Sequence, residues 1–347
     1  MKIKLSNGKI IASSERCFII AEAGVNHNGN LKLGKKLIDL AVSAGADAVK
    51  FQTFLADEII LENAPKARYH VETTGSDKKL SWYNLLKTQE INLSMHKKLI
   101  NYCKKKKIIF MSTPYDKKSV DLLCKLEIEI FKIASTDSNN YQLIEYIAKK
   151  GKPVILSTAM SSFKEIKKSV MILEKYLKKN FILMQCTGSY PAPIADANLK
   201  VIDTYKKKFK CLVGYSDHVL DDTSAIAAIS FGINCYEKHI TVCKELPGPD
   251  HRASLNKTEF TNLIKKIRSA ETSLGNGIKQ IMTSEIENVK KLKKYLVARK
   301  NIYKGQKINS LDITAKRTGG IGIPASKYFD IKNKLAWKNF KKNSIIL

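Results

Sequence analysis

The sequence of 347 residues predicts an α/β fold, a (β/α)8 TIM barrel followed by a small, mostly-β domain. Short apolar runs that are typical of buried strands recur eight times, and each gap between them is long enough for a helix. The runs span residues 18–21, 48–51, 108–111, 130–133, 154–156, 181–184, 212–215 and 235–236. Eight such units over about 250 residues match the size and rhythm of this barrel. A doubly wound open sheet is the alternative, and it would not need eight units.

The amino-terminal segment predicts a hairpin. Two short apolar runs, 3–5 and 9–11, flank the turn sequence Ser6-Asn7-Gly8. We expect residues 1–17 to form a plug beneath the barrel. Between the first two barrel strands, apolar residues recur at helical spacing and stop at Gly45, which predicts a helix that ends there.

The seventh and eighth runs each end in a polar cluster that contains a histidine. Ser216-Asp217-His218 follows the first of the two, and Glu237-Lys238-His239 follows the second. An Ala- and Ile-rich segment of helical length separates them, so the two strands are expected to be parallel neighbours. Parallel neighbours lie about 5 Å apart, and both tips then face the same way. His218 and His239 are therefore candidate ligands of one metal ion, although a lone histidine is more often a packed or surface residue.

Two lysines lie inside apolar strands. Lys50 and Lys132 would be costly to bury unless each pairs with an anion. Hydroxyl residues occupy the ends of several other strands, and the active site of such a barrel lies at the carboxyl ends of its strands. The two lysines with these hydroxyls suit a phosphate and a carboxylate on one small substrate. The alternative is that each lysine forms a structural ion pair with Glu22 or Glu237.

Composition limits the classes of protein to which the chain can belong. No apolar run approaches the ~20 residues of a membrane span, and the first residues lack the apolar core of a signal peptide, so a cytoplasmic protein without membrane contact is expected. The seven cysteines are scattered without a CxxC pair, which suits reduced thiols. The net charge of +29 comes from lysines spread over predicted helix faces, so we expect no nucleic-acid partner. A basic field would still concentrate small anionic substrates.

Nine segments in this order resemble the N-acetylneuraminate (sialic acid) synthase family, within which the bacterial enzymes for legionaminic acid are the nearer branch. They are IIAEAGVNHNGN (19–30), AGADAVKFQTF (44–54), MSTPYD (111–116), FKIAS (131–135), ILSTAM (155–160), QCTGSYPAP (185–193), GYSDH (214–218), YEKHIT (236–241) and GPDH (248–251). The resemblance covers the first 280 residues. It implies an enzyme that condenses phosphoenolpyruvate with an open-chain N-acetylated hexosamine and water, giving a nine-carbon keto acid and phosphate.

The resemblance also assigns roles to residues that match. His218 and His239 would hold a divalent ion, for which Mn²⁺ is expected and Mg²⁺ or Co²⁺ are the alternatives. The residues implied in binding phosphoenolpyruvate are Lys50, Thr113, Lys132, Ser135, Ser157 and Ser216. Those implied in holding the sugar are Glu22, Gln52, Tyr190, Asp250 and Arg317. Glu22, Lys50, Asp137, His218 and His239 would carry the catalysis.

The sequence departs from the family pattern at two positions and in one loop. Thr136-Asp137 follows Ser135 where the family often has Gly-Glu, so Asp137 is expected to orient the attacking water with a shorter side chain. Gly188 replaces an asparagine that some sialic acid synthases carry near the sugar. The loop 63–80 is closer to the enzymes for diacetamido sugars. The hexosamine therefore stays open between N-acetylmannosamine and 2,4-diacetamido-2,4,6-trideoxymannose.

The last part of the chain predicts a separate domain. We expect the barrel over 1–280, a linker helix over 281–294 opened by a capping box of Ser284 and Glu287, and a second domain over 295–347. The second domain resembles the antifreeze-like (SAF, β-clip) domain of the same family. That resemblance implies a domain-swapped homodimer in which Arg317 contacts the N-acetyl group of the sugar in the partner's barrel. A basic RNA-binding tail is the alternative reading of this segment.

Two other functions remain open from the sequence. A related metal-dependent synthase would use a phosphorylated aldose, and it would need an additional pair of cationic side chains for the second phosphate. A non-catalytic basic binding protein would release no phosphate from phosphoenolpyruvate.

Overall fold

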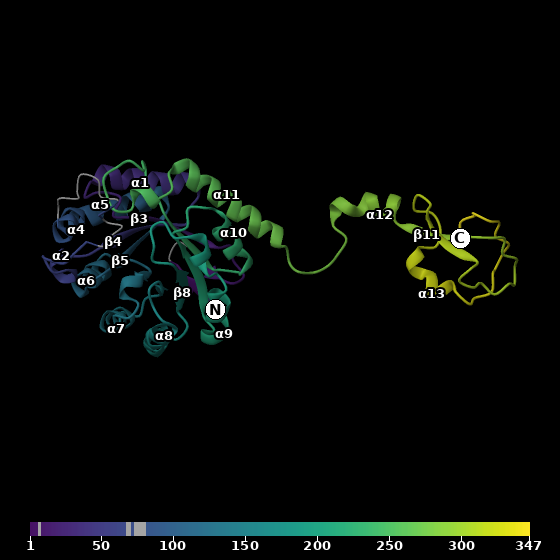
Figure 1. Ribbon diagram of the computed structural model, residues 1–347, viewed down its shortest axis with the longest axis horizontal. Coiled ribbons are helices and arrows are strands. Elements are labelled where there is room, and N and C mark those ends of the chain that lie inside the picture. Colours follow the sequence, from purple (N-terminus) through teal and green to yellow (C-terminus); the bar gives the residue numbers. More distant parts are fainter. Residues whose placement is uncertain (6–7, 67–70, 73–80) are drawn as a thin grey trace. The chain divides into compact units, whose positions relative to one another are not determined.

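The computed structural model describes residues 1–5, 8–66, 71–72 and 81–347. The chain divides into two compact units, Met1–Gly275 and Asn276–Leu347 (Figure 1). Each unit has its own hydrophobic core.

The first unit is a closed barrel of eight parallel strands in the described residues, as the sequence predicts. Around the barrel the order is β10-β3-β4-β5-β6-β7-β8-β9, so neighbours in sequence are neighbours in space and β10 closes onto β3. The strands are β3 (Phe18–Gly24), β4 (Ala48–Thr53), β5 (Ile109–Pro114), β6 (Phe131–Ile133), β7 (Val154–Ser157), β8 (Phe181–Cys186), β9 (Leu212–Asp217) and β10 (Cys235–His239).

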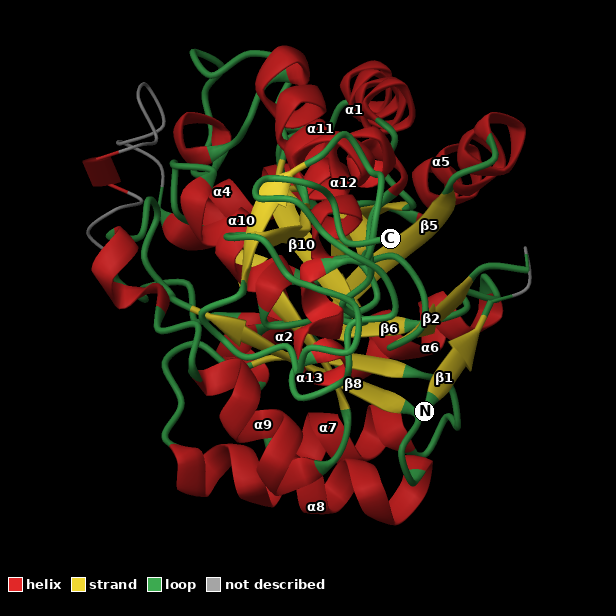
Figure 2. Ribbon diagram, turned by 90° about the vertical axis from the view of Figure 1, so that its right-hand side faces the viewer, coloured by secondary structure: helices red, strands yellow, loops and turns green. Residues whose placement is uncertain are grey.

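Helices surround the strands of the barrel (Figure 2). They are α1 (Leu31–Ala44), α2 (Ala56–Ile59), α4 (Trp82–Gln89), α5 (Leu93–Lys106), α6 (Lys117–Lys125), α7 (Tyr141–Ala148), α8 (Phe163–Leu177), α9 (Val201–Phe209), α10 (Thr223–Ser230) and α11 (Lys257–Leu274). Helix α1 shows why such a segment folds as it does. Asn30 caps its first turn by accepting from the backbone N–H groups of Lys32 and Leu33, and Gly45 ends it in the left-handed region at φ 88°. The predicted stop at Gly45 is confirmed.

The amino-terminal hairpin closes the end of the barrel at which the strands begin. Strand β1 (Lys2–Lys4) pairs with β2 (Ile10–Ala12) in antiparallel register, and Ser6 and Asn7 of the predicted turn lie outside the described residues. Ile3 and Ile11 are at most 1% exposed and pack in one cluster with the inward-facing apolar residues of the strands. The hairpin therefore lies against this end of the barrel core and leaves the opposite end for a site.

The second unit contains one regular two-stranded antiparallel sheet in its described chain. Strand β11 (Lys294–Ala298) pairs with β12 (Ile313–Arg317), and isolated bridges join Val297 to Ile345 and Ile302 to Phe340. Short helical turns complete the unit: η5 (Thr283–Glu285), α12 (Ile286–Leu292), η6 (Ala325–Lys327) and α13 (Tyr328–Ile331). A small apolar cluster that includes Leu296, Ile313 and Phe340 forms its core. Its relation to antifreeze-like domains stays a prediction.

The predicted capping box of Ser284 and Glu287 is wrong. Helix α12 begins at Ile286 without a side-chain cap, because the preceding residues form the 3₁₀ turn η5. Glu285, rather than Glu287, accepts a hydrogen bond from the backbone N–H of Met282 at 2.8 Å. Glu287 pairs with Lys291 one turn later at 2.6 Å.

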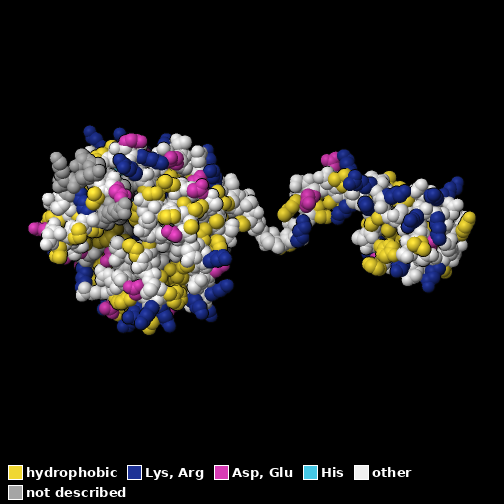
Figure 3. Space-filling view, in the orientation of Figure 1, with side chains coloured by type: hydrophobic (Ala, Val, Ile, Leu, Met, Phe, Trp, Pro, Cys, Tyr) yellow, Lys and Arg dark blue, Asp and Glu magenta, His cyan; other side chains and the backbone are white. Residues whose placement is uncertain are grey.

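The described surface and thiols agree with the compositional analysis. Lysine and arginine side chains are spread over the visible faces of both units rather than gathered in one arm (Figure 3). All seven cysteines are free thiols, five of them buried. In the residues that the structure describes, every helix is too short or too polar to span a bilayer.

Three buried histidines lie beside the barrel, outside its mouth. His27 is 0% exposed and packs on Phe51 with ring centroids 5.9 Å apart. Burial, with His96 and His251 nearby, lowers the pKa of His27 to about 4. Burial also lowers the pKa of His251 to about 4. These side chains are therefore neutral in the folded state at neutral pH.

Acid is expected to destabilise the barrel through His27. Between pH 6.5 and about 4 the unfolded chain binds a proton at this side chain and the folded chain does not. The free energy of unfolding then falls by up to about 3 kcal/mol as the pH falls through that window, and it is unaffected above it. In a Trp337→Phe background, Trp82 fluorescence during urea unfolding follows the barrel alone. His27→Gln should show a smaller loss of stability from pH 7 to 4.5.

The same pair of proteins provides the control for this experiment. Between pH 7 and 8 both should keep a constant difference in stability, because His27 is neutral in both states there. An equal loss of stability in the two proteins from pH 7 to 4.5 would show that His27 is not responsible.

Candidate active site

A cavity of about 640 Å³ lies at the carboxyl ends of the barrel strands. Residues from all eight strands or from the loops that follow them line it. Of the side chains singled out in the sequence, it brings together Glu22, Lys50, Gln52, Lys132, Ser135, Asp137, Ser157, Tyr190, Ser216, His218, His239 and Asp250. The parallel strands place these side chains at one end because each follows a run of buried residues of similar length.

The two lysines lie in a buried charge network with two glutamates. Lys50 Nζ is 2.9 Å from Glu22 Oε2 and 3.7 Å from Glu237 Oε2, and Lys132 Nζ is 3.2 Å from Glu237 Oε1. All four side chains are at most 6% exposed. The ion pairs considered as the alternative are therefore present, and they line the same cavity as the hydroxyl groups.

The glutamates respond differently to this environment. Burial raises the pKa of Glu22 to about 7, although Lys50 opposes it, so the carboxyl can exchange a proton at neutral pH. Burial alone would also raise the pKa of Glu237, but Lys132 and Lys50 outweigh it and hold that pKa below its ordinary value. Burial lowers the pKa of Lys132. The cavity therefore contains a carboxylate that stays charged and a carboxyl that titrates.

The rings of the two histidines are neighbours, with centroids 5.4 Å apart and planes inclined by 51°. His218 Nδ1 lies 2.7 Å from the carbonyl oxygen of Thr187, to which it can donate, and this leaves Nε2 as the lone-pair nitrogen. Burial lowers the pKa of His239 well below its ordinary value, so that its imidazole is neutral. Burial acts on the pKa of His218 in the same direction, but Cys186 and the Thr187 carbonyl outweigh it and raise that pKa. The Nδ1 atom of His239 is buried without a hydrogen-bond partner in the described structure. A divalent ion binds the neutral form of an imidazole, so an ion between the two rings would compete with a proton at His218.

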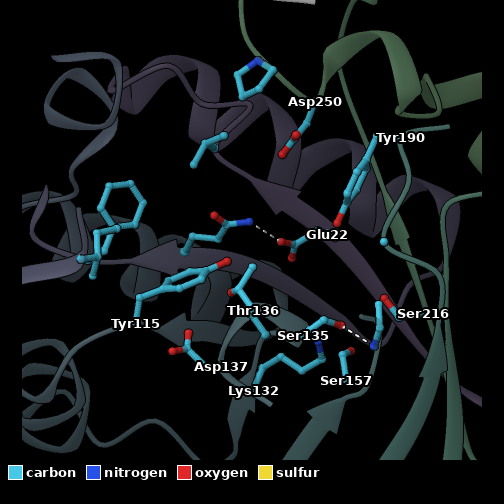
Figure 4. Close-up of a pocket in the computed structure, with 18 of the residues that line it drawn as sticks. Glu22, Tyr115, Lys132, Ser135, Thr136, Asp137, Ser157, Tyr190, Ser216 and Asp250 are labelled. Carbon is cyan, nitrogen blue, oxygen red and sulfur yellow. Dashed lines mark hydrogen bonds between the residues drawn. The ribbon is translucent and has the colours of Figure 1, made fainter. Parts of the chain in front are cut away.

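The polar side chains line the cavity from several directions. Figure 4 shows Lys132, Ser135, Ser157 and Asp137 on one side and Asp250 and Tyr190 on the other, with Glu22 between them. Ser157 Oγ is buried with no hydrogen-bond partner among the described residues, so it is available to a bound group.

The other hydroxyls and the amide beside Glu22 are already engaged. Ser135 Oγ accepts from the backbone N–H of Ala159 at 3.0 Å, and Ser216 Oγ donates to Glu237 Oε1 at 3.0 Å. Gln52 Nε2 donates to Glu22 Oε1 at 3.2 Å. These contacts hold the side chains in place at the cavity wall.

Two further carboxyl groups lie at the cavity. Asp250 Oδ2 is 3.7 Å from His239 Nδ1, and burial raises the pKa of Asp250 to about 6. Asp137 Oδ1 accepts from the side chain of Asn140 at 2.9 Å, and burial raises the pKa of Asp137 as well.

Two of the predicted site residues lie elsewhere. Thr113 is 1% exposed and stands behind the cavity wall, where its hydroxyl accepts from Lys50 Nζ at 2.9 Å. It therefore contacts Lys50, which lines the cavity, and does not line the cavity itself. Arg317 ends β12 in the second unit, paired in register with Lys294. Its assignment to the sugar stays a prediction.

The site also contains residues that sequence reasoning did not select. Glu237 joins both lysines, although only its role as an ion-pair partner was considered. Met160 also lines the cavity, and its side chain lies against Gly188 so closely that a Cβ there would be 2.9 Å from Met160 Cγ. A side chain at position 188 would have to displace Met160, which links the departure at Gly188 to a neighbour in the loop that follows β7.

An apolar wall completes the cavity. It consists of Phe54, Ile59, Ile60, Leu85 and Leu86 from the segment that follows β4. The loop 63–80, which in the sequence favours the enzymes for diacetamido sugars, lies largely outside the described residues.

Comparison with known proteins identifies the family. A model of the NeuB family matches residues 37–279. The chain is 42% identical to the N,N'-diacetyllegionaminic acid synthase of Campylobacter jejuni, over 96% of this chain and 99% of that protein. The chain belongs to the NeuB family. The NeuB match covers most of the barrel unit, and the relative is similar over both units.

Two other NeuB relatives extend the comparison. The N,N'-diacetyllegionaminic acid synthase of Legionella pneumophila is 36% identical over 99% of this chain and 97% of its own length. The crystal structure of the N-acetylneuraminic acid synthetase of Leptospira borgpetersenii, in complex with citrate, aligns with a TM-score of 0.72 at 36% identity. That alignment covers 83% of this chain and 95% of the other.

Proposed function

We propose that this NeuB protein condenses phosphoenolpyruvate with 2,4-diacetamido-2,4,6-trideoxymannose and water, giving N,N'-diacetyllegionaminic acid and phosphate. The reaction class, a phosphoenolpyruvate-dependent synthesis of a nonulosonic acid from an amino sugar, follows from the family. One observation of the site carries the proposal: two buried lysines, several hydroxyl groups, two histidines and the carboxyl groups of Glu22 and Asp250 line a single cavity at the carboxyl ends of the barrel strands.

The basic side of the cavity suits phosphoenolpyruvate. Lys50 and Lys132 would contact its phosphate and carboxylate, with Ser135 and Ser157 donating hydrogen bonds. Ser216 would donate as well once its hydroxyl turns from Glu237 to the substrate. At an effective dielectric constant near 20, a close pair of unit charges is worth roughly 4 kcal/mol before desolvation. The ammonium groups already share carboxylates, so the substrate anions would compete with Glu22 and Glu237 for them.

The opposite side suits the open-chain sugar. Glu22, Gln52, Tyr190 and Asp250 would hold its hydroxyl and amide groups. The apolar wall, represented by Phe54 and the leucines of α4, would favour a sugar with a C6 methyl group and a second acetamido group over one with more hydroxyls.

His218 and His239 would hold the divalent ion, and Mn²⁺ suits imidazole ligands better than Mg²⁺ does. Their rings lie 5.4 Å apart at one end of the cavity strands, and burial keeps His239 neutral. Within the described ranges no group of three or more potential ligands is arranged around one point, so two histidines would leave coordination positions for water and substrate. When bound, the ion would supply Lewis-acid polarisation of the sugar aldehyde.

The residues of the chain position the other steps. C3 of phosphoenolpyruvate forms a bond to C1 of the sugar, and the aldehyde oxygen takes a proton. Water then adds to C2 and loses a proton, and the C2–O bond to phosphate breaks. Glu22, with its pKa near 7, is suited to exchange a proton beside the sugar, and Asp137 is suited to orient the water. The domain-swapped homodimer with Arg317 supplied in trans belongs to the same proposal and rests on the resemblance alone.

The substrate is tested by phosphate release from phosphoenolpyruvate with Mn²⁺ present. The diacetamido sugar is expected to give a kcat/KM at least about tenfold above that of N-acetylmannosamine, since one small group is worth about 10- to 200-fold in an apolar pocket. A higher kcat/KM with N-acetylmannosamine would make that sugar the substrate instead. N-acetylmannosamine 6-phosphate is included to test the alternative synthase that uses a phosphorylated aldose. If none of the three sugars led to release of phosphate from phosphoenolpyruvate, the proposal that the protein is a synthase would be overturned.

A further inference from the structure

A second buried cluster lies directly behind the two histidines, on the outer face of β9 and β10. Side chains alternate along these strands, so Ser216 and Glu237 line the cavity while Asp217 and Lys238 point toward the helices. Asp217 and Lys238 are directly opposite each other in register, with side chains that are 0% and 2% exposed. Each immediately precedes one of the proposed metal ligands.

Asp217 accepts hydrogen bonds from five groups. The hydroxyl groups of Tyr215 and Tyr236 donate to it at 3.0 and 2.7 Å, and Lys238 Nζ donates at 3.0 Å. The hydroxyl of Ser224, on α10, lies 3.3 Å from Oδ1. The fifth donor is the backbone N–H of Val219, at 2.9 Å.

Hydrogen bonds to the backbone of Val219 restrain the chain directly after His218. Val219 donates its N–H to Asp217, and its carbonyl oxygen accepts from Lys238 Nζ. His218 therefore lies between two residues that the cluster fixes, and its own carbonyl accepts from Ala192 at 2.9 Å.

The cluster begins where the backbone pairing of these strands stops. The β9–β10 register ends at Asp217 and Lys238, so neither His218 nor His239 is paired across this ladder. Beyond that point, the side chain of Lys238 on β10 donates hydrogen bonds to Asp217, the last residue of β9, and to the backbone carbonyl of Val219 in the loop that follows. The separation of the two imidazoles thus depends on this link as well as on the barrel ladder.

We propose that Asp217 and Lys238 are positioning residues, which set the separation and orientation of His218 and His239 and thereby the affinity of the barrel for a divalent ion. The inference rests on the proposed metal site. Groups that orient metal ligands from behind typically change affinity by about 10- to 100-fold when they are removed. Removal of a buried ion pair without a positioning role would change the stability of the protein and leave its affinity for the ion unchanged.

The test is the Mn²⁺ affinity of the metal-free full chain, measured by titration calorimetry and by loss of the free-ion electron paramagnetic resonance signal. The double variant Asp217→Asn/Lys238→Met removes both charges together, so no unpaired charge is left buried. Its dissociation constant is expected to rise by about 10- to 100-fold. Tyr236→Phe removes one donor without changing charge, and a smaller rise of a few-fold is expected there.

Asp47→Asn is the matched control. Asp47 also accepts from a backbone N–H, that of Ile19 at 2.8 Å, and from Lys9 and Arg268, but it lies at the end of the barrel where the strands begin. Its replacement should lower stability and leave Mn²⁺ affinity unchanged. Urea unfolding of each variant shows that the comparison is made on folded protein.

The outcomes separate the inference from the function on which it rests. Wild-type affinity in both folded cluster variants would overturn the positioning role and leave the metal site standing. Equal weakening in Asp47→Asn would also overturn it, because stability alone would then explain the effect. Absence of Mn²⁺ binding by the wild-type chain would overturn the metal site together with the inference.

Discussion

Replacing His218 or His239 with alanine is expected to remove nearly all turnover and the dependence on divalent ions while the barrel stays folded. Each imidazole is buried at the cavity, and the two rings lie 5.4 Å apart. Loss of either would leave the ion with one protein ligand and the sugar aldehyde without its polarising group. Loss of a single preorganised donor typically costs about 10² to 10³ in rate, and loss of the ion should cost at least as much. Phosphate release and Mn²⁺ titration measure the two effects.

His27→Gln is the control for these substitutions. His27 is also a fully buried histidine, but it does not line the cavity. This variant should keep its turnover and its Mn²⁺ dependence at neutral pH. Wild-type activity that persists after exhaustive chelation would contradict the metal site.

Lys50→Met and Lys132→Met are expected to weaken binding of phosphoenolpyruvate by tenfold or more. Methionine keeps the apolar stem and removes the charge that would face the phosphate or the carboxylate. A tenfold loss corresponds to about 1.4 kcal/mol, well below the gross attraction of one buried charge pair. The measurement is the dissociation constant of phosphoenolpyruvate by calorimetry, without sugar.

The charge network predicts that the two lysine variants differ in stability. Lys50 pairs with Glu22 and also lies near Glu237, so Lys50→Met leaves Glu22 without its cation. Lys132→Met leaves Glu237 beside Lys50 and should be the milder change. Lys206→Met provides a control, because Lys206 donates to the carbonyl of Phe231 away from the cavity. Unchanged affinity in both cavity variants would assign Lys50 and Lys132 to structural ion pairs alone.

The fold of the first unit could be predicted because its information is local. Each barrel strand is a short apolar run, and each is followed by a segment with helical periodicity, so eight units in order leave few alternative arrangements. The hairpin and the end of α1 at Gly45 follow from short-range turn chemistry. The positions of most site residues follow as well, because parallel strands of similar length carry their last residues to one end.

The capping of α12 was not predictable in the same way. Ser284 and Glu287 have the spacing of a capping box, but the chain forms a 3₁₀ turn over Thr283–Glu285 and uses Glu285 instead. Several cap arrangements with similar local energies were available there, and the helix is only one turn or two long. Sequence spacing does not choose between them.

The sequence by itself therefore determined the barrel, its closed end and the group of polar side chains at its open end. The tertiary structure decided how those side chains pair. It placed Glu237 between Lys50 and Lys132, put Thr113 behind Lys50, and laid Met160 over Gly188. The physical reason is that each of these contacts joins different strands or their loops. Such contacts depend on the register with which the closed barrel brings strands together and on the direction that each buried side chain takes, and neither is encoded in local spacing.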